Sequence, residues 1–216
     1  MKKFELTTES ITNEAGKKLF RIKALIDFGD VKAGELGGYV EKEGNVSQDD
    51  NAWVSGDAEV FGNAKVSGNA KVFGNAKVYD NARVSGNARV SGDAKVYGNA
   101  RVSGDAKVYD NARVYGDARV YGNAWVSGNA WVYGDALVFG DADYALVQGF
   151  GTEFRCTTFY RGKDKKIMVN CGCFHGNLEA FRKQAKETRS GKIAKEYLMI
   201  ADLMEYHFAS EDSSDE

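Results

Sequence analysis

Histidine, cysteine and long apolar runs are all scarce in this chain of 216 residues. Its two histidines exclude a metal site built from three histidines of one chain. Its three cysteines, a small and odd number, fit a reducing compartment better than a disulfide framework. No apolar run approaches the roughly 20 residues that span a bilayer, and the first residues, MKKFELTTES, lack the apolar core of a signal peptide. We therefore expect a cytoplasmic protein without a membrane partner.

An excess of charge of either sign is also missing. Lys and Arg total 29, Asp and Glu total 31, and the net charge is −2. A chain this close to neutrality does not attract nucleic acid or an anionic membrane through its overall field. The placement of the cations along the chain is more informative.

The chain does contain a regular six-residue repeat. Alanine occupies every sixth position from Ala52 to Ala142, and valine every sixth position from Val54 to Val138. Each hexad reads as an extended Ala-x-Val-x segment and a corner, usually Gly-Asn or Gly-Asp, because these residues accept or tolerate positive φ. Side chains alternate along a strand, so we expect alanine and valine to face inward and both x residues outward. A helix is excluded because glycine would interrupt every second turn.

Three six-residue repeats per coil give an 18-residue turn and a triangular prism of parallel strands, with coils about 4.8 Å apart. We predict this parallel β-helix over residues 46–149. Its last coil should end near Val147, because the hexad timing slips at Tyr144. Stacked coils need caps at both ends, and we expect residues 1–45 to form a β cap over the first coil.

The composition changes after the repeats to that of a small α+β module over residues 150–208. It should contain a hairpin with a polar turn around residues 162–165. Two helices follow, the first with Asn177 as its N-cap and the second near residues 193–208. The acidic, polar tail of residues 209–216 is expected to be disordered.

The hexads resemble those of the hexapeptide-repeat superfamily of left-handed β-helices. The leading segment, LFRIKALIDFGDVKAGELGGYVEKEGNVSQDDNAWV, is similar to the start of the YdcK family, and the likeness extends over about residues 19–147. The left hand is implied by this resemblance alone, because the usual crossover rule favours the right hand. The expected fold class is therefore mainly β, a left-handed parallel β-helix with a small C-terminal α+β module. The YdcK family carries only a general transferase label, so the resemblance implies a fold more than a reaction.

The familiar enzymes of this superfamily are acyltransferases, commonly trimers, that use a coil histidine as general base. Here no histidine lies between residues 52 and 143, and His175 and His207 both fall in the C-terminal module. Without a coil group that titrates near neutral pH, that mechanism has no base. We expect a non-enzymatic binding protein without a cofactor. An acyltransferase stays as the alternative, if one of these histidines is brought to the coils.

The C-terminal stretch with CGCF followed by LEAF resembles segments of phage-type proteins. That resemblance suggests a phage origin and, with it, a host protein as one kind of partner. A nucleotide-like or polyanionic ligand is the other kind.

Outward residues eighteen positions apart should stack in columns. A basic, aromatic surface can bind such a ligand by stacking and charge. The alternative is structural, because aromatic neighbours stabilise a sheet by roughly 0.5–1.5 kcal/mol per pair and exposed Lys and Arg maintain solubility. A second face stacks Ser67, Ser85 and Ser103 beside Lys65, Arg83, Arg101 and Arg119. The predicted ligand-binding residues are Tyr79, Tyr97, Tyr115, Tyr133, Lys77, Lys95 and Arg113.

Near the end of the repeats the outward residues become apolar on all three faces. We expect the C-terminal helices to fold back over them, since such a collar is rarely left in water. A homo-oligomer interface is the alternative, and the two are compatible. The predicted interface residues are Trp125, Trp131, Leu137 and Phe139.

Three thiols and an imidazole in the C-terminal module define one candidate metal site. Cys171, Cys173 and His175 alternate in CGCFH, with Cys156 on the strand expected to pair with them. However, C-x-C is not the usual ligand spacing, and small buried thiols are common. The sequence leaves this question open, and we assign no metal ligand.

Overall fold

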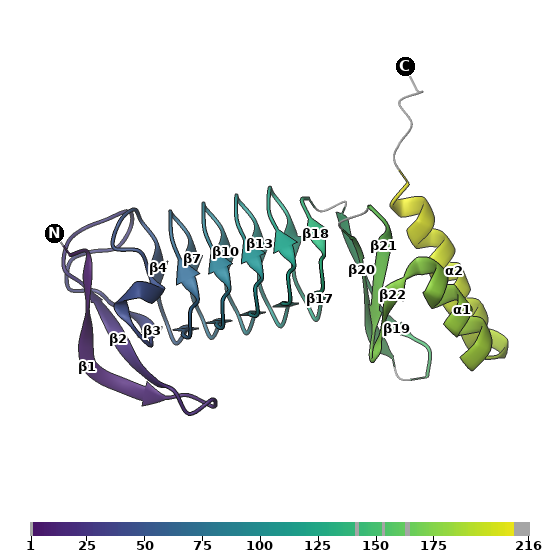
Figure 1. The fold of residues 1–216 in the computed structure, drawn as a ribbon, viewed down its shortest axis with the longest axis horizontal. Helices are drawn as coiled ribbons and strands as arrows, with labels where there is room; N and C mark the ends of the chain where they lie inside the picture. The colour runs from purple at the N-terminus through teal and green to yellow at the C-terminus, as the bar shows by residue number, and fades with distance from the viewer. Residues whose placement is uncertain (1, 141–142, 153, 163–164, 210–216) are drawn as a thin grey trace, which may run out of the picture.

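The computed structural model describes residues 2–140, 143–152, 154–162 and 165–209. The molecule is elongated, with a β hairpin at the N-terminal end, a stack of triangular coils, and a sheet covered by two helices at the other end (Figure 1). The centre of the predicted polar turn and most of the predicted acidic tail lie outside the described residues.

Residues 53–138 form fifteen two-residue strands, three per coil, which make three parallel sheets. The ladder face contains β5 (Glu59–Val60), β8 (Lys77–Val78), β11 (Lys95–Val96), β14 (Arg113–Val114) and β17 (Trp131–Val132). The serine face contains β6 (Lys65–Val66), β9 (Arg83–Val84), β12 (Arg101–Val102), β15 (Arg119–Val120) and β18 (Leu137–Val138). The mixed face contains β4 (Trp53–Val54), β7 (Lys71–Val72), β10 (Arg89–Val90), β13 (Lys107–Val108) and β16 (Trp125–Val126).

The register confirms the 18-residue coil, because each strand residue of the first four coils pairs with the one eighteen positions later, as Lys77 does with Lys95. The strands are shorter than the four residues expected, since the corners bend the chain on either side of x-Val. Hydrogen bonds still continue past the strand, where Tyr79 N–H donates to Val96 O (3.1 Å) and Asn81 N–H to Gly98 O (2.9 Å).

Alanine and valine fill the interior, as the alternation predicts. Each alanine from Ala52 to Ala136 and each valine from Val54 to Val138 is buried. At about 1.5 kcal/mol or more per buried valine, stacking neighbouring coils is the main source of stability. The predicted fold class is confirmed as a mainly β parallel solenoid with a small C-terminal module, and its handedness stays a prediction.

Glycine at the corners is required by the approach of the next coil. A Cβ at Gly104, where φ is +70°, would lie 2.9 Å from the backbone nitrogen of Gly122. Asp80 and Asp110 adopt the same left-handed conformation, with φ of 58°. The Asp80 carboxylate accepts a hydrogen bond from Gly98 N–H at 3.2 Å, so it also ties one coil to the next.

The N-terminal cap continues the sheet of the ladder face. It contains β1 (Phe4–Thr12), β2 (Lys18–Ala24), β3 (Leu36–Val40) and a short 3₁₀ helix (Glu43–Asn45). β1 and β2 form a hairpin, and β3 pairs in parallel with β5, so this edge of the first coil is covered. Lys3 is 2% exposed, and its ammonium donates to the carbonyls of Asp49, Asp50 and Ala52 at 3.3, 3.3 and 2.9 Å. Burial lowers the pKa of Lys3 to about 8.

The C-terminal module is a four-stranded antiparallel sheet followed by two helices. Its elements are β19 (Tyr144–Phe150), β20 (Arg155–Arg161), β21 (Ile167–Cys171), β22 (Phe174–Asn177), α1 (Leu178–Thr188) and α2 (Gly191–His207). Residues 144–149, which the repeat count assigns to the β-helix, belong instead to this sheet, because the segment after the timing slip pairs with β20. The predicted N-cap is confirmed, since Ala180 N–H donates to Asn177 Oδ1 at 2.8 Å.

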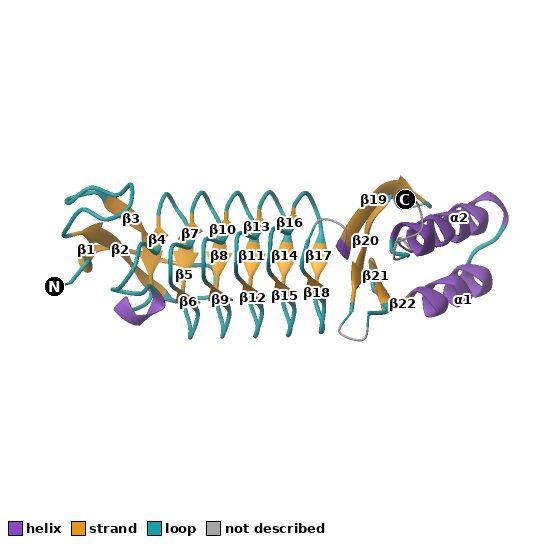
Figure 2. Cartoon of the chain, turned by 90° about the horizontal axis from the view of Figure 1, so that it is seen from above, coloured by secondary structure: helices purple, strands orange, loops and turns teal. Residues whose placement is uncertain are grey.

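The sheet stands between the coils and the helices (Figure 2). One face packs Tyr160 against the end of the solenoid, and the other packs Phe159 and Val169 against α1 and α2. The prediction that the helices fold back over the apolar collar is therefore wrong. Trp125, Trp131 and Phe139 remain 46%, 39% and 59% exposed. Within the described residues, no helix is both long and apolar enough to cross a membrane.

Candidate functional site

The ladder face holds five aromatic rings in one continuous stack. Ring centroids from Phe61 through Tyr79, Tyr97 and Tyr115 to Tyr133 are 5.0, 4.9, 4.8 and 4.7 Å apart, with interplanar angles of 12° or less. This geometry follows from in-register strands, which place equivalent side chains one coil apart. Each inner ring has both faces covered by its neighbours, so the ladder offers ring edges and hydroxyl groups rather than faces on which a base could stack.

The ladder hydroxyls are protonated at neutral pH. Burial raises the pKa of Tyr79 and of Tyr115 to about 12 and raises the pKa of Tyr97 and Tyr133 as well. The charge of Arg113 acts in the opposite direction on the pKa of Tyr97, which shows that this cation lies close enough to influence the row. The ladder therefore presents phenol groups that can donate hydrogen bonds.

A column of charged residues runs beside the ladder. Lys77 forms ion pairs with Glu59 at 3.2 Å and with Glu14 of the hairpin tip at 3.7 Å. Among the described residues Lys95 makes no ion pair. The Arg113 guanidinium lies over the Trp131 ring at 5.0 Å, a cation–π contact that leaves its charge available. The three predicted cations thus differ, because only Lys77 is neutralised.

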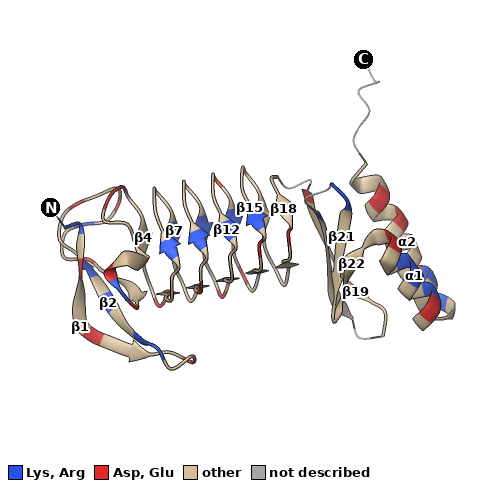
Figure 3. Ribbon diagram, in the orientation of Figure 1, with Lys and Arg blue, Asp and Glu red and all other residues tan. Residues whose placement is uncertain are grey.

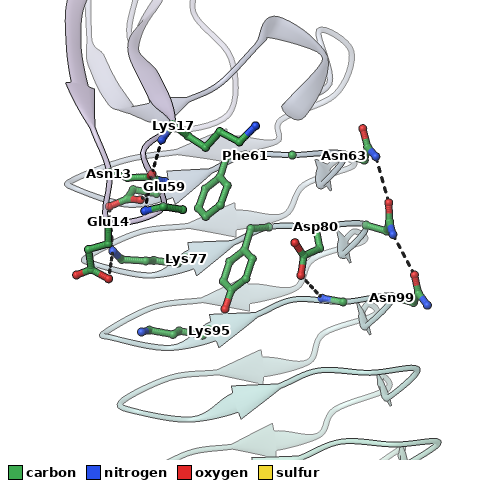
Figure 4. Close-up of a pocket in the computed structure, with 15 residues that line it drawn as sticks. Asn13, Glu14, Lys17, Glu59, Phe61, Asn63, Lys77, Asp80, Lys95 and Asn99 are labelled. Carbon is green, nitrogen blue, oxygen red and sulfur yellow. Dashed lines mark hydrogen bonds and ion pairs between the residues drawn. The ribbon is translucent and has the colours of Figure 1, made fainter.

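A groove of about 740 Å³ lies where the hairpin tip overhangs the ladder face. Figure 4 shows Phe61 at its centre, Lys77 and Lys95 on one side and Asn63 and Asn99 on the other. The groove collects ammonium groups, amides and aromatic edges from three successive coils. The lining residues outside the ladder face are Asn13, Glu14, Ala15 and Lys17 of the hairpin tip, with Gly62, Asn63, Asp80, Asn81, Gly98 and Asn99 at the corners.

The amide wall of this groove is a hydrogen-bonded column that sequence reasoning missed. Asn63 Nδ2 donates to Asn81 Oδ1, Asn81 to Asn99 and Asn99 to Asp117, at 3.2, 3.2 and 3.0 Å. Each amide keeps one N–H for water or a ligand. Asparagine recurs at eighteen-residue spacing in the sequence, but the corner motif by itself predicts only a turn residue.

At its other end the ladder is continued by a histidine from the C-terminal module. The His175 ring lies 4.5 Å from that of Tyr133, and its Nδ1 is 2.7 Å from Asn170 Oδ1. Asn170 Nδ2 donates to Trp131 O at 2.8 Å, which fixes Oδ1 as the acceptor. Nδ1 therefore donates to Oδ1, and in the neutral form of the ring the lone pair lies on Nε2. His207 ends α2, on the far side of the sheet.

A second groove of about 530 Å³ separates the last coils from the C-terminal sheet. It brings together Arg113, Trp131 and Cys156, which the sequence assigned to three different roles. Burial raises the pKa of Cys156, whose thiol donates to Asn129 O at 3.4 Å. The groove therefore contains a guanidinium, an indole and a protonated thiol.

The candidate metal residues are not gathered at one place. Gly172, with φ of 61°, and Cys173 form a tight turn, so CGCFH is not one strand. Cys171 contacts Thr157 Oγ1 on the helix side of the sheet, whereas His175 faces the coils. The part of the chain that the structure describes contains no cluster of three His, Cys, Asp or Glu residues able to hold a metal ion.

The predicted interface residues do not share a surface. Trp125 belongs to the mixed face, Trp131 to the ladder face, and Leu137 and Phe139 to the serine face. Lys107 Nζ lies 4.2 Å from the Trp125 ring centroid. A single flat interface cannot bury all of them, and homo-oligomerisation stays a prediction.

The coils place the chain among parallel β-solenoid proteins. Their repeats match the YdcK β-solenoid repeat, which confirms that resemblance over residues 76–134. The matched segments are residues 76–92, 82–96, 94–110, 106–120, 112–128 and 118–134. They do not extend to the leading segment or to the C-terminal module. A search of curated proteins finds no match.

Proposed function

We propose that this protein is a binding protein whose solenoid presents the ladder face to an anionic ligand. The observation that carries the proposal is the groove at the hairpin tip, where Lys95, the Tyr79 hydroxyl and an amide column surround one open space. All three kinds of group donate hydrogen bonds to phosphate or carboxylate oxygens. The ligand is nucleotide-like or another polyanion, bound by charge and hydroxyl donors rather than by ring stacking.

The rigid repeat explains why a binding role suits the scaffold. Lys95 and Arg113 lie one coil apart, on paired strands beside Tyr97 and Tyr115. An extended ligand along the solenoid axis would meet a cation and a tyrosine hydroxyl at each of these two coils. An acidic segment of a host protein would meet the same donors, and the experiment must separate these two kinds of ligand.

Native mass spectrometry of the freshly purified full chain is the first test, with the denatured mass as control. A retained nucleotide would identify the ligand, and the same spectrum would count subunits. Calorimetry with ATP then compares the wild type with Lys95→Glu and with Arg89→Glu on the mixed face. Lys95→Glu should weaken binding about 10-fold or more, equivalent to about 1.4 kcal/mol, and Arg89→Glu should not. The proposal fails if no nucleotide or polyanion binds at low salt, or if both variants lose affinity equally.

A group transferase is the second candidate, and His175 is the observation that favours it. The structure brings this histidine to the coils, with Asn170 holding Nδ1 and Nε2 free to take a proton from an acceptor hydroxyl or amine. The test is incubation with acyl-coenzyme A and a panel of amines and sugars. Turnover by the wild type that His175→Gln abolishes would establish it, and absence of turnover would leave the binding role alone.

A further inference from the structure

The serine face carries a straight column of four exposed cations. Lys65, Arg83, Arg101 and Arg119 belong to strands that pair in register, so they recur at the strand spacing of about 4.8 Å. Figure 3 shows Lys and Arg as blue bands on successive coils. Within the described ranges none of these four side chains has an ion pair, a hydrogen bond or a ring contact.

On the other two faces, cations near the N-terminal end are paired with carboxylates, and cations near the C-terminal end lie against aromatic rings. At the N-terminal end, Glu59 pairs with Lys77, and Asp30 pairs with Lys71 at 2.6 Å. At the C-terminal end, indole rings lie against Arg113 and Lys107. The serine face has neither arrangement among the residues that the structure describes, although the same sequence repeat builds all three faces.

The carboxylates at the flanking corners are directed to other donors. Asp105 accepts from Asn87 at 2.9 Å, Asp117 accepts from Asn99 at 3.0 Å, and Asp80 accepts from Gly98 N–H. Glu43, near the start of the column, pairs with Lys2 at 2.8 Å. Like charges on adjacent strands repel one another, so an anionic partner along the column would relieve that repulsion.

We propose that the serine face binds an acidic polysaccharide, a sugar chain with repeated carboxylate or sulfate groups, laid along the solenoid axis. The charged groups of the polymer would meet the four cations, and its hydroxyls would meet Ser67, Ser85 and Ser103, which stand two residues after the first three cations. Serine beside Lys65, Arg83 and Arg101 favours a sugar chain over single-stranded nucleic acid, since sites for the latter use aromatic side chains as stacking platforms. The aromatic residues of this face, Tyr121 and Phe139, follow at its C-terminal end and pack edge to face against each other. This surface is separate from the ladder face, so the proposal does not depend on the function proposed above.

The test measures binding of the full chain to fluorescently labelled heparin, to alginate and to oligo-dT of matched charge. Wild-type protein should bind heparin and alginate at low salt, with log K falling against log salt at a slope of about −3 or steeper, because several cations release counterions. Arg83→Gln/Arg101→Gln should weaken binding at least about 10-fold and flatten that slope by about 2. The matched control is Arg89→Gln/Lys107→Gln on the mixed face, which removes the same charge and should leave binding unchanged.

Three results would overturn the proposal. One is the absence of binding to either polysaccharide at low salt. Another is an equal loss in both double variants, which would mean attraction by net charge alone. The third is tighter binding of oligo-dT than of heparin at matched charge, which would assign the face to nucleic acid. Because all of the substituted residues are outward-facing, unchanged thermal unfolding in both variants verifies that folding is intact. Lys95→Glu should leave heparin binding unaltered, which separates this face from the ladder face.

Discussion

The two ends of the solenoid are closed by different means. At the N-terminal end the backbone continues, with β3 paired to β5, a bridge between Val46 and Val66, and Lys3 over three carbonyls. At the C-terminal end one bridge joins Ala136 to Gly162 in the described residues, and side chains make the other connections.

The C-terminal contacts are single hydrogen bonds from the sheet to the last coil. Thr158 Oγ1 accepts from Trp131 N–H at 3.2 Å, Asn170 donates to Trp131 O, and the Tyr160 hydroxyl donates to Tyr133 O at 3.1 Å. The first end is therefore an extension of the same sheet, and the second is the docking of a separate module. We expect the first end to depend on backbone geometry and the second on a few side chains.

The largest effect should come from a Cβ placed between coils. Gly104→Ala puts that atom 2.9 Å from Gly122 N and 3.0 Å from its carbonyl oxygen, at a φ of +70°. We expect a loss of about 3 kcal/mol in the free energy of unfolding, measured with urea. Gly128→Ala, near the C-terminal end of the coils, meets no atom of the described residues within 4 Å and should lose only about 1 kcal/mol, because its φ is +63°. Equal losses of unfolding free energy in the two variants would show that the close approach of the neighbouring backbone does not set the cost of the added Cβ.

Asn170→Ala should produce the next largest effect, because this amide is 4% exposed and contacts Trp131, Tyr160 and His175. Its removal leaves the Trp131 carbonyl without its donor, at a cost of about 2 kcal/mol. Hydrogen exchange should show the C-terminal sheet opening before the coils. The control is Asn111→Ala at an exposed corner, which should change neither quantity. Uniform acceleration of exchange through both parts would contradict a separately docked module.

Stability should rise with pH because of Lys3. Its pKa is about 8 in the folded protein and 10.5 when unfolded, so between these values the unfolded chain binds more protons. Lys3 alone should therefore increase the free energy of unfolding by about 2 kcal/mol between about pH 8 and about pH 9.5. Cys156 and the ladder tyrosines act in the opposite direction in the upper part of this range because their pKa values are raised in the folded protein, so the increase is taken as the difference between the wild type and Lys3→Met. Urea titrations of both proteins at both pH values measure this difference. An equal change with pH in the two proteins would assign it to another group.

The smallest effect should follow from removing one hydroxyl. Tyr160→Phe eliminates the hydrogen bond to Tyr133 O without changing the packing, and should cost about 1 kcal/mol. Tyr206→Phe on α2, where the side chain is 83% exposed, is the control and should be neutral. A loss in the control of similar size would attribute the effect to tyrosine chemistry in general rather than to docking.

The parts of the fold governed by local repetition were predictable from the sequence. The positions of alanine and valine set the coil, and eighteen-residue spacing placed Tyr79 beneath Tyr97 in the ladder. The N-cap at Asn177 follows from rules that act within one helical turn.

Contacts between the solenoid and the C-terminal module produce no repeating pattern in the sequence. Nothing near His175 indicates that it stacks on Tyr133, because that contact depends on how a whole sheet docks. The tight turn at Gly172 and Cys173 split CGCFH between two strands, which alternation alone did not reveal. Whether neighbouring rings of the ladder cover one another depends on how each ring is oriented, whereas the sequence indicates only how far apart the rings lie.

The corner asparagines give the solenoid a direction. In the column that begins at Asn63, every amide donates toward the C-terminal end, so the side-chain dipoles add and polarise one another. A carboxylate can accept such a bond but cannot pass one on, so the column stops at Asp117, and the column that begins at Asn51 stops at Asp105. Coils with nearly the same sequence therefore have fixed positions in the order along the solenoid. Placing an aspartate one coil earlier would shorten the hydrogen-bonded column without changing the backbone of the coil.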